Sequence, residues 1–230
     1  LEHGMINQPH PVKLFSWGPV FRHDNPQSGR YRQFHQFNFE VIGDSSLEID
    51  SQLITMVKSM YKSFGLEVEI ELNSIGCKEC RMPYIRQLTK HLKKNETKLC
   101  KTCQERIKTN PLRVLDCKTK SCQEVVDEAP QIVDHLCDVC KEHFVKVLEN
   151  LDEVNVGYNL NPRLVRGLDY YTRTTFEIFS VTEEKGDEKR IALGGGGRYD
   201  GLMEILGGRP TPAIGMAVGV ERVINLLKES

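Results

Sequence analysis

The chain has 230 residues, of which 39% are hydrophobic and 27% charged, and this suits one or two globular domains that each bury a core. Its net charge of −1 excludes a protein that is basic overall and attracts nucleic acid through its total charge. No apolar run reaches the roughly 18 residues of a membrane span and the first fifteen residues lack a secretory pattern, so we expect a cytoplasmic protein without membrane association.

Two strands are predicted at the start of the chain. Residues 12–22 and 33–42 have strand patterns and are joined by the polar loop 23–32. In the second strand, alternation places Gln36 and Glu40 on one face, opposite a row that is mostly aromatic. The sequence therefore predicts a hairpin whose second strand holds one carboxylate, Glu40, between the apolar residues Phe39 and Val41.

A helix and a third strand are predicted to follow. The apolar stripe from Ile49 to Phe64 has helical spacing, and Ser45 with Glu48 predicts a capping box at the helix start. Residues 66–72 alternate between aliphatic residues and glutamates, which is typical of a half-buried strand.

The last third of the chain returns to strand patterns. Residues 164–180 and 190–193 are predicted as antiparallel strands, and the glycine-rich stretch 193–202 as a turn that opens a short helix. Residues 212–227 are predicted as a strand that runs directly into a helix. Antiparallel strands with segregated helices predict an α+β fold.

The middle of the chain differs in composition from both ends. Lysine and arginine exceed acidic residues by 13 to 4 over residues 77–122, giving +9, whereas residues 123–153 have 2 against 9, giving −7. We interpret residues 77–152 as a mainly helical insertion with a basic side, within a discontinuous core formed by 1–76 and 153–230.

All eight cysteines lie in this insertion, in four close pairs. The pairs are Cys77 with Cys80, Cys100 with Cys103, Cys117 with Cys122, and Cys137 with Cys140. Without a secretory signal, this spacing indicates zinc rather than disulfides, and a nested arrangement joins the first pair to the last and the second to the third. Eight free thiols, or a redox role for one pair, are the alternatives.

The hairpin loop collects cations that suit phosphate. Arg22 ends the first strand, and Arg30 and Arg32 follow the turn, so their guanidinium groups can grip a polyphosphate. A solvated surface hairpin explains the same residues. Glu40 and Gln36 form a candidate recognition pair for a ligand with N–H groups, and a structural ion pair of Glu40 is the alternative.

Two further stretches contain candidate binding residues. In RGLDYYTRTTFEI (166–178), strict alternation puts Arg166 and Tyr171 on opposite faces, so a shared pocket requires an irregularity at Gly167. An exposed polar strand is the simpler interpretation. In GMAVGVERV (215–223), Arg222 stands at a helix start, where a bound anion is favoured, although a solvated first turn is common there.

These stretches together resemble one family. FRHDNPQSGRYRQFHQF resembles motif 2 of class II aminoacyl-tRNA synthetases in its histidyl form, and RGLDYYTRTTFEI resembles the histidine-binding signature of that form. GGGGRYDGL and GMAVGVER resemble its glycine-rich segment and motif 3. The resemblance covers the whole chain and is greatest to bacterial histidyl-tRNA synthetases. It implies a class II antiparallel sheet flanked by helices, ATP-dependent activation of histidine, and transfer to tRNA(His).

The resemblance also implies roles for individual residues. It implies that Arg22 contacts the α-phosphate of ATP, Arg30 the outer phosphates, and Phe34 with Arg222 the adenine, with Mg²⁺ bridging phosphates. Arg166 then stabilises charge at the α-phosphate electrostatically. The implied histidine-binding residues are Gln36, Glu40, Tyr170, Tyr171 and Tyr199, together with Arg166.

Some features depart from the family pattern. Asp24 and Asn25 stand where the family usually has Glu-Arg, so one loop arginine is missing. The chain begins after the expected place of motif 1, which builds the family's homodimer, and it has no anticodon-binding domain, so we expect a catalytic-core fragment. In this family the insertion lies near the acceptor arm of tRNA, which matches the basic side.

Two other kinds of protein fit parts of the pattern. One is a non-catalytic, histidine-sensing regulatory paralogue in histidine biosynthesis. Such paralogues tend to lose the RGLDYY signature and the phosphate arginines, and here Arg22, Arg166 and Arg222 are present. The other is a zinc-stabilised RNA-binding module on an inert core. Histidine-dependent exchange of pyrophosphate into ATP separates these alternatives from the enzyme.

Overall fold

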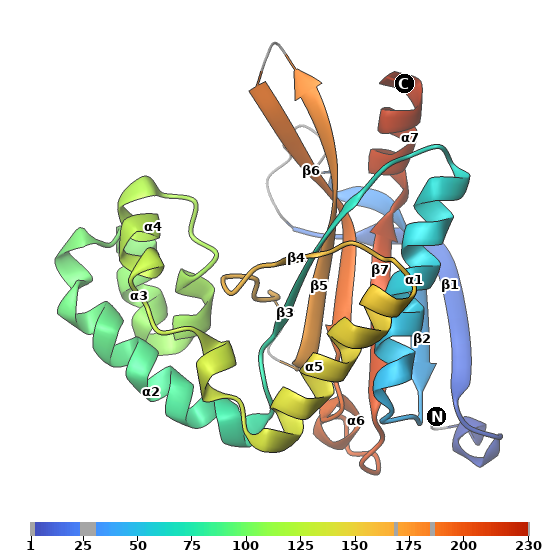
Figure 1. The fold of residues 1–230 in the computed structure, drawn as a ribbon, viewed down its shortest axis with the longest axis horizontal. Helices are drawn as coiled ribbons and strands as arrows, with labels where there is room; N and C mark the ends of the chain where they lie inside the picture. The colour runs from blue at the N-terminus through green and yellow to red at the C-terminus, as the bar shows by residue number, and fades with distance from the viewer. Residues whose placement is uncertain (1–2, 24–30, 168–169, 185–186, 230) are drawn as a thin grey trace.

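A computed structural model describes residues 3–23, 31–167, 170–184 and 187–229 of the chain. Within these residues, seven strands form one sheet in the order β1-β2-β7-β6-β5-β3-β4, and helices pack against it (Figure 1). All neighbouring strands are antiparallel except β3 and β4, whose short pairing is parallel. The predicted α+β fold is confirmed.

The strands are β1 (Val12–Phe21), β2 (Gln33–Ile42), β3 (Glu69–Ser74), β4 (Asn159–Leu160), β5 (Thr172–Glu184), β6 (Asp187–Arg198) and β7 (Ala213–Gly219). The helices are α1 (Leu47–Ser63), α2 (Lys78–Lys94), α3 (Lys101–Thr109), α4 (Lys120–Asp127), α5 (Asp138–Glu153), α6 (Leu202–Ile205) and α7 (Val220–Glu229). Short 3₁₀ helices are η1 (Met5–Asn7), η2 (Glu96–Lys98), η3 (Pro111–Val114) and η4 (Ile132–His135).

The hairpin predicted at the start of the chain is confirmed. β1 and β2 pair over ten residues each, from Val12 opposite Ile42 to Phe21 opposite Gln33. The backbone N–H of Arg22 donates to the carbonyl of Arg32 at 2.8 Å and closes the described part of the loop. The predicted residues Arg30, Asp24 and Asn25 lie outside the described residues.

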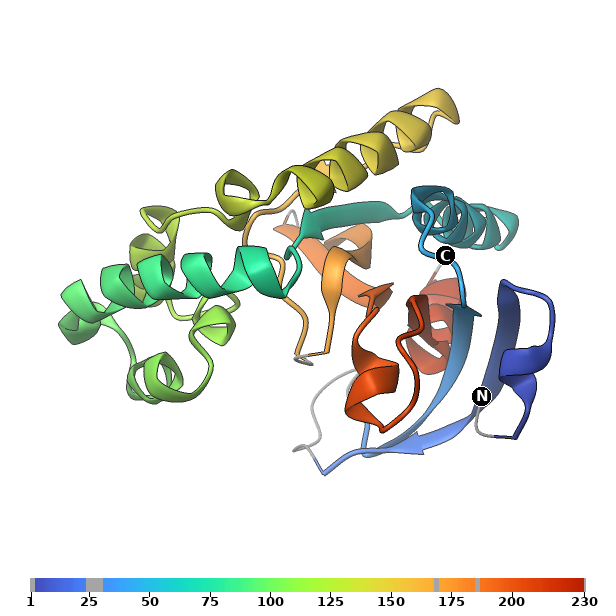
Figure 2. The same ribbon diagram turned by 90° about the horizontal axis from the view of Figure 1, so that it is seen from below.

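One face of the sheet is covered by helices. α1 and α5 lie side by side on it, and α7 packs near the end of β7 (Figures 1 and 2). Apolar residues of these helices meet alternate residues of the strands, such as Phe176 and Ile178 of β5, in one buried cluster. Glu177 lies between these two residues, so it points to the opposite face, where the candidate site lies.

The start of α1 differs from the prediction. The helix begins at Leu47 with Ser46 as its N-cap residue, and no side chain caps it, so the predicted capping box of Ser45 and Glu48 is wrong. Because the helix begins later, Glu48 is only its second residue. Instead, the Asp44 carboxylate accepts the backbone N–H of Ser46 at 2.8 Å.

The boundaries of three predicted strands were also wrong, and the strand predicted at 66–72 is β3, Glu69–Ser74. β5 begins at Thr172 rather than at 164, because residues 164–167 run in an irregular path beside the cysteine-rich helices. β6 continues through Arg198, so the glycine run 194–197 lies in a strand and not in a turn. These glycines lie close to neighbouring backbone: a Cβ at Gly195 would be 2.6 Å from the Phe176 carbonyl oxygen.

The cysteine-rich helices form a lobe beside the sheet. We define the helical lobe as residues 77–137, which contain α2, α3, α4 and η2 to η4 (green in Figures 1 and 2). It has its own buried cluster, which includes Tyr84, Leu88 and Val125. α5 leaves the lobe and places Phe144 in the cluster under the sheet. The division into a core (1–76 and 153–230) and an insertion (77–152) stays a prediction.

A buried ion pair joins α1 to β6. The Arg198 side chain is fully buried and donates to the Asp50 carboxylate and, at 2.8 Å, to the Ser46 carbonyl. The Thr174 hydroxyl donates to the same carboxylate at 2.6 Å. This network satisfies a charge pair that burial would otherwise make costly. Among the described residues, no helix has the length and apolar character of a membrane span.

Candidate active site

A cavity of about 300 Å³ lies on the sheet face that α1 and α5 leave uncovered. Its walls come from the connection between β1 and β2, from β2, β5, β6 and β7, from the start of α7, and from the segment before β5. The lining residues are Arg22, Tyr31, Phe34, Gln36, Arg166, Glu177, Ala192, Leu193, Gly194, Gly195, Ala217, Gly219, Glu221 and Arg222. Five predicted site residues therefore line one cavity: Arg22, Phe34, Gln36, Arg166 and Arg222.

Arg22 and Phe34 face each other across the hairpin. The guanidinium carbon of Arg22 lies 4.2 Å from the centre of the Phe34 ring, and its Nε donates to the Tyr31 carbonyl at 2.7 Å. This cation–π contact covers one face of the ring that was predicted to stack on adenine. Arg30, the other predicted phosphate ligand of this loop, lies outside the described residues.

Arg166 lies in the irregular segment before β5 and contacts residues of the cavity and of the aromatic cluster. Its Nη1 is 3.7 Å from a Glu177 carboxylate oxygen, and its guanidinium carbon is 5.7 Å from the centre of the Tyr171 ring. Its Nε is buried and has no hydrogen-bond partner among the described residues. A buried, unpaired N–H of a guanidinium is costly, so this atom suits an acceptor supplied by a ligand.

Arg166 and Tyr171 approach each other because neither belongs to a strand. Strict alternation would put the two residues on opposite faces only if a strand included both, but β5 begins at Thr172. The irregularity expected at Gly167 is a bend there, and the shift of strand register lies further on, between Thr172 and Thr175.

A second group of predicted residues gathers around Glu40. The Tyr199 hydroxyl donates to the Glu40 carboxylate, and the Tyr170 ring lies 5.7 Å from the Tyr199 ring and 4.8 Å from that of Tyr171. Burial raises the pKa of Glu40, and the hydrogen bond from Tyr199 opposes this only in part. This cluster adjoins the cavity through Arg166, which contacts both.

Glu177 is a cavity residue that the sequence analysis did not identify. Burial raises its pKa, and the nearby Arg166 guanidinium opposes the rise. The strand pattern contained a signal: Phe176 and Ile178 are apolar, so Glu177 between them must point to the polar face.

Glu221 is the second carboxylate that was missed. It accepts the backbone N–H of His35 at 2.8 Å and contacts the His35 Nδ1 at 2.8 Å. Burial alone would raise the pKa of Glu221, but the hydrogen bonds from His35 outweigh it and hold the pKa below its usual value. Glu221 thereby fixes the start of α7, where Arg222 lines the cavity and donates to the Ala192 carbonyl.

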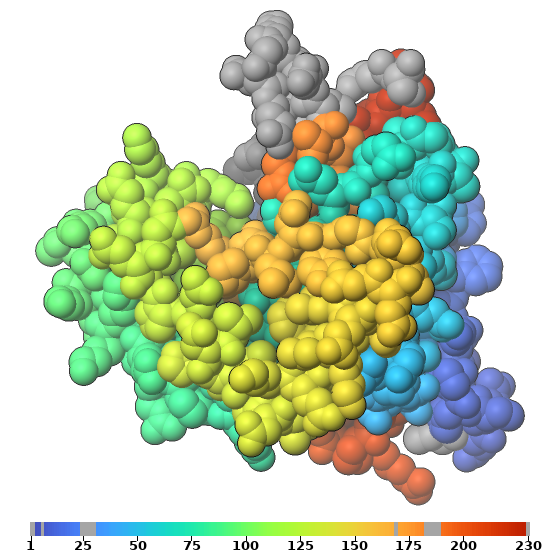
Figure 3. Space-filling view, in the orientation of Figure 1, coloured from blue at the N-terminus to red at the C-terminus, as the bar shows by residue number. Residues whose placement is uncertain are grey.

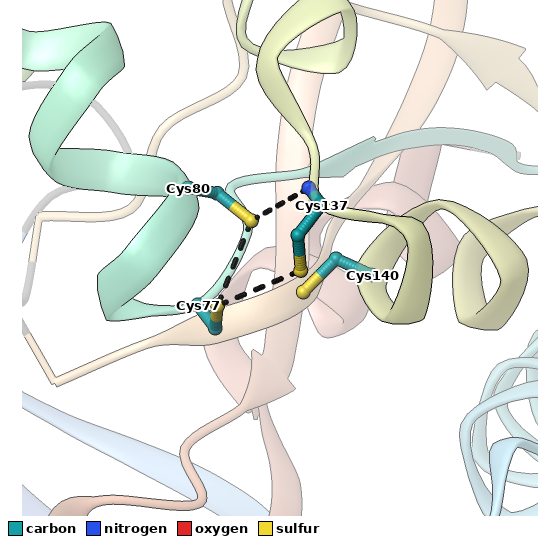
Figure 4. A group of neighbouring side chains, drawn as sticks. All are labelled: Cys77, Cys80, Cys137 and Cys140. Carbon is teal, nitrogen blue, oxygen red and sulfur yellow. Dashed lines mark hydrogen bonds between the residues drawn. The ribbon is translucent and has the colours of Figure 1, made fainter.

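The eight cysteines form two compact groups. Cys77, Cys80, Cys137 and Cys140 make one group, and Cys100, Cys103, Cys117 and Cys122 make the other; within each, all four sulfurs lie within 4.8 Å of one another. This is the nested pairing predicted from the spacing. In the first group, the sulfurs from the start of α2 and the start of α5 converge on a common point (Figure 4).

Comparisons with known proteins agree on one family. The family model described as histidyl-tRNA synthetase matches residues 2–223. The histidine--tRNA ligase of Natranaerobius thermophilus is 48% identical over 231 residues, which cover 100% of this chain and 54% of that protein. The ligase of Dehalococcoides mccartyi is 48% identical over 229 residues, covering 99% of this chain and 54% of that protein. The chain thus spans about half the length of these relatives.

Solved structures agree with the sequence matches. The crystal structure of apo S. aureus histidyl-tRNA synthetase superposes with a TM-score of 0.78 at 37% identity, over 99% of this chain and 54% of that chain. A Bacillus halodurans structure titled as an ATP phosphoribosyltransferase regulatory subunit/histidyl-tRNA synthetase reaches a TM-score of 0.65 at 18% identity over 98% of this chain and 61% of that one, which shows a shared fold alone. From the family match, the identities and this superposition we conclude that the chain belongs to the histidyl-tRNA synthetase family of class II aminoacyl-tRNA synthetases.

Proposed function

We propose that this chain carries the site where histidine and ATP react to form histidyl-adenylate, the intermediate for esterification of tRNA(His). The observation that carries the proposal is the position of Arg166. Its guanidinium lies between the cavity and the Glu40 cluster, and its buried Nε has no partner among the described residues. A cation in this place suits the α-phosphate, where the two substrates join.

ATP is proposed to occupy the cavity. Arg22 contacts the α-phosphate, and Phe34 with Arg222 holds the adenine; both arginines and the ring line the cavity. Arg22 covers the Phe34 ring in this structure, so its guanidinium must leave the ring face when phosphate binds, or the adenine must use the other face. The role of Arg30 at the outer phosphates stays a prediction.

Histidine is proposed to bind beside Arg166 in the Glu40 cluster. The Glu40 carboxylate accepts an N–H of the substrate, and Tyr171, Tyr170 and Tyr199 form the aromatic wall around it. Gln36 holds the α-amino group, on the same strand face as Glu40. A substrate N–H gives the buried Glu40 carboxylate a second partner, which offsets the cost of its burial.

The reaction needs charge stabilisation rather than proton transfer. A carboxylate oxygen of histidine attacks the α-phosphorus, the bond from this phosphorus to the bridging oxygen breaks, and pyrophosphate leaves with the electron pair. Negative charge grows on the α-phosphate oxygens in the transition state. Arg166 and Arg22 stabilise that charge from fixed positions.

Mg²⁺ fits the cavity as an ion carried mainly by the nucleotide. Among the described residues the cavity is lined by two carboxylates, Glu177 and Glu221, and no group of three acidic or histidine ligands forms there. One or two carboxylates plus phosphates is the usual setting for this ion. His35 contacts Glu221 at 2.8 Å, whereas Arg166 is 3.7 Å from Glu177, so Glu177 would be the more available ligand from this chain. When bound, Mg²⁺ neutralises phosphate charge.

The partners of the whole protein are proposed from the family. We infer that tRNA(His) contacts the basic side of the helical lobe, that the full-length protein is a cytoplasmic homodimer, and that this chain is its catalytic core. The excess of nine positive charges over residues 77–122 supports the first inference.

Histidine-dependent exchange of labelled pyrophosphate into ATP tests the proposal, in a full-length protein that contains this chain. Arg166→Ala should lower the exchange rate about 100- to 1,000-fold, because a preorganised charge at the reacting group is lost. The control is Arg86→Ala, an exposed residue of α2, with an unchanged rate. Histidine binding without exchange in the parent would identify a sensor, and exchange unaffected by Arg166→Ala would reject the role of this residue.

A further inference from the structure

We propose that the two cysteine groups bind one zinc ion each, and that the two ions hold the helical lobe against the chain segment that carries Arg166 and Tyr171. The junction site is Cys77, Cys80, Cys137 and Cys140, and the distal site is Cys100, Cys103, Cys117 and Cys122. We define the β5 approach as residues 161–167 and 170–171, which precede β5. The proposal is independent of the reaction proposed above.

The sulfur positions match a single tetrahedral ion. In the junction site, Cys77 Sγ lies 3.6 Å from Cys80 Sγ and 4.0 Å from Cys137 Sγ, and in the distal site Cys100 Sγ lies 4.0 Å from Cys117 Sγ. Zn–S bonds of about 2.3 Å in a tetrahedron place the sulfurs about 3.8 Å apart. A disulfide needs about 2.05 Å, so none of these contacts is a disulfide.

The backbone around both sites has the same design. Cys77, Cys100 and Cys137 are N-cap residues, so their sulfurs lie where a helix dipole favours negative charge. In each site one of these residues donates its N–H to a buried sulfur of the opposite pair. Cys137 donates to Cys80 Sγ at 3.1 Å, and Cys100 donates to Cys122 Sγ at 3.2 Å.

A backbone N–H that donates to a sulfur stabilises the negative charge of its thiolate form, so these two hydrogen bonds favour the state that binds a metal. Four thiolates in a tetrahedron select Zn²⁺ or a single iron ion over the hard cations. On binding, the metal takes the four sulfurs as thiolates and their protons pass to the solvent.

The junction site joins the two places where the chain enters and leaves the helical lobe. Cys77 and Cys80 begin α2, directly after β3, and Cys137 and Cys140 begin α5, which packs under the sheet (Figure 4). One turn into α2, the Arg81 guanidinium donates to the carbonyl of Tyr171. An ion here therefore fixes the start of α2 next to the aromatic wall of the Glu40 cluster.

Backbone pairing reinforces this link. The carbonyl of Gly76 accepts the N–H of Arg173 at 2.9 Å, and Ile75 donates to the Arg173 carbonyl at 2.8 Å. Gly76 has a φ of +64° and no room for a side chain, because a Cβ would lie 2.7 Å from Cys80 Cβ. The chain thus passes directly from the junction site into its pairing with β5.

The distal site stabilises the surface of the lobe on which the β5 approach lies. It connects α3 to α4 and to the loop of Cys117, all within the buried cluster of the lobe. Asp127 at the end of α4 pairs with Arg163 of the β5 approach, and Val165 packs against the same buried cluster. In the space-filling view the orange β5 approach lies directly on the lobe (Figure 3).

Metal content tests the sites. The purified chain should contain about two zinc ions, and Cys77→Ser with Cys80→Ser, or Cys100→Ser with Cys103→Ser, should each leave about one. Ser121→Ala, an exposed neighbour of Cys122, should leave two. The proposal is overturned if the parental chain contains no metal after growth in zinc. It is also overturned if either pair of substitutions leaves the metal content unchanged. Iron in place of zinc overturns the choice of metal.

The intact chain gives a test that does not depend on the folding of variants. Co²⁺ added to the metal-free chain should saturate at two equivalents with the intense thiolate-to-cobalt absorption of four-sulfur sites. All eight thiols should resist a thiol reagent until a chelator is added. Immediate reaction of all eight thiols in the untreated chain, with no cobalt absorption, overturns the two sites.

Hydrogen exchange tests whether the two ions hold the helical lobe against the β5 approach. The amides of Arg163 and Leu164 bond to Asn161 at 2.9 and 3.0 Å within the β5 approach. Removal of zinc by a chelator should speed their exchange at least 10-fold, whereas the amides of Ile214 and Met216 in the centre of the sheet should keep their rates. If exchange at Arg163 and Leu164 were unchanged, the ions would not hold the β5 approach in place, even if the chain bound two of them.

Discussion

The Glu40 side chain lies on β2, where its burial and its hydrogen bonding make it a candidate for selecting the substrate. Its carboxylate is half-buried, its pKa is raised by burial, and the Tyr199 hydroxyl is the partner that the structure gives it. A ligand with N–H groups completes its hydrogen bonding. The residue is therefore a better candidate for selecting histidine than for gripping ATP.

Glu40→Gln should weaken histidine binding about 10- to 100-fold and leave ATP binding unchanged. A charge-assisted hydrogen bond contributes about 1.5–3 kcal/mol, and the amide keeps the shape of the side chain. Calorimetric titration with each substrate measures both affinities. Glu142→Gln, at an exposed position of α5, is the matched control. Equal losses for histidine and ATP would show that Glu40 has a structural role.

The positions of site residues could be predicted from the sequence where they lie on a regular strand, because alternation then fixes the face to which each side chain points. Gln36 lies in the cavity wall, and its position on one face of β2 could be predicted because β2 is regular from end to end; its role in binding histidine stays a prediction. The approach of Arg166 to Tyr171 was not predictable, since both precede β5 and their path depends on packing against the helical lobe. Glu221 was missed as a cavity residue because its partner His35 is 186 positions away in the sequence.

Among the elements, β6 contains four consecutive glycines, Gly194 to Gly197, which are unfavourable in a strand by intrinsic propensity. Its four glycines were predicted as a turn, since glycine weakens isolated strands. Close contact with β5 and β7 reverses that preference, because the neighbouring backbone occupies the space of a side chain. A tertiary contact of this kind cannot be predicted from one strand alone, whereas the regular hairpin of β1 and β2 could be.

Gly196→Ala should destabilise the chain by several kcal/mol. Its Cβ would overlap the Gly215 carbonyl oxygen, and backbone in the middle of a sheet cannot move aside. Urea unfolding of the parent and the variant measures the loss. Gly201→Ala is the control: no atom lies within 4 Å of its Cβ and its φ is −92°, so its stability should stay close to that of the parent. Equal effects of the two changes would contradict the packing argument.

α5 places a histidine beside the buried ion pair. Burial, with the charges of Arg198 and Arg173, lowers the pKa of His143 from 6.5 to about 4. Its Nε2 is 3.5 Å from the Asp50 carboxylate, which Arg198 and Thr174 already occupy. His143 is therefore neutral in the folded chain at pH 7.

The stability of the chain should fall between pH 7 and pH 5 partly because of His143. The unfolded chain binds this proton below pH 6.5, while the folded chain does so only near pH 4, so acid favours unfolding by on the order of 1–2 kcal/mol. His143→Gln should remove this part of the pH dependence in urea titrations at the two pH values. Val145→Ala, an exposed change on α5, should keep the full dependence. An unchanged slope in His143→Gln would contradict the assignment.

At the scale of the whole molecule, the total charge is close to zero, but charge is segregated within residues 77–153. Within residues 77–153, the basic residues gather on α2, α3 and the following loop, and the acidic residues lie mainly from α4 through α5. A polyanion that approaches the chain is therefore attracted to the lobe and repelled by α5. This arrangement suits the proposed tRNA contact.

Replacing Lys90, Lys93 and Lys94 of α2 by Gln should weaken tRNA binding about 10-fold at low salt. It should also make the dependence of log K on log salt less steep by roughly 2–3, about one for each lost phosphate contact. Filter binding over a range of salt concentrations measures both. Lys141→Gln with Lys146→Gln on α5 is the control and should leave the slope unchanged. Equal effects of the two sets would show that tRNA does not prefer the lobe.

The closeness of the two ends of the helical lobe also affects how the chain folds. β3 must pair with β5, and Ser74 meets Thr174 across about 100 residues of sequence. Closing so long a loop in a disordered chain costs entropy before any contact compensates for it. Once the lobe has folded, Cys77 and Cys137 lie side by side, and only about 40 residues remain to be closed. Because the lobe is synthesised before β5, it can fold first on the ribosome and shorten the search for the central sheet pairing.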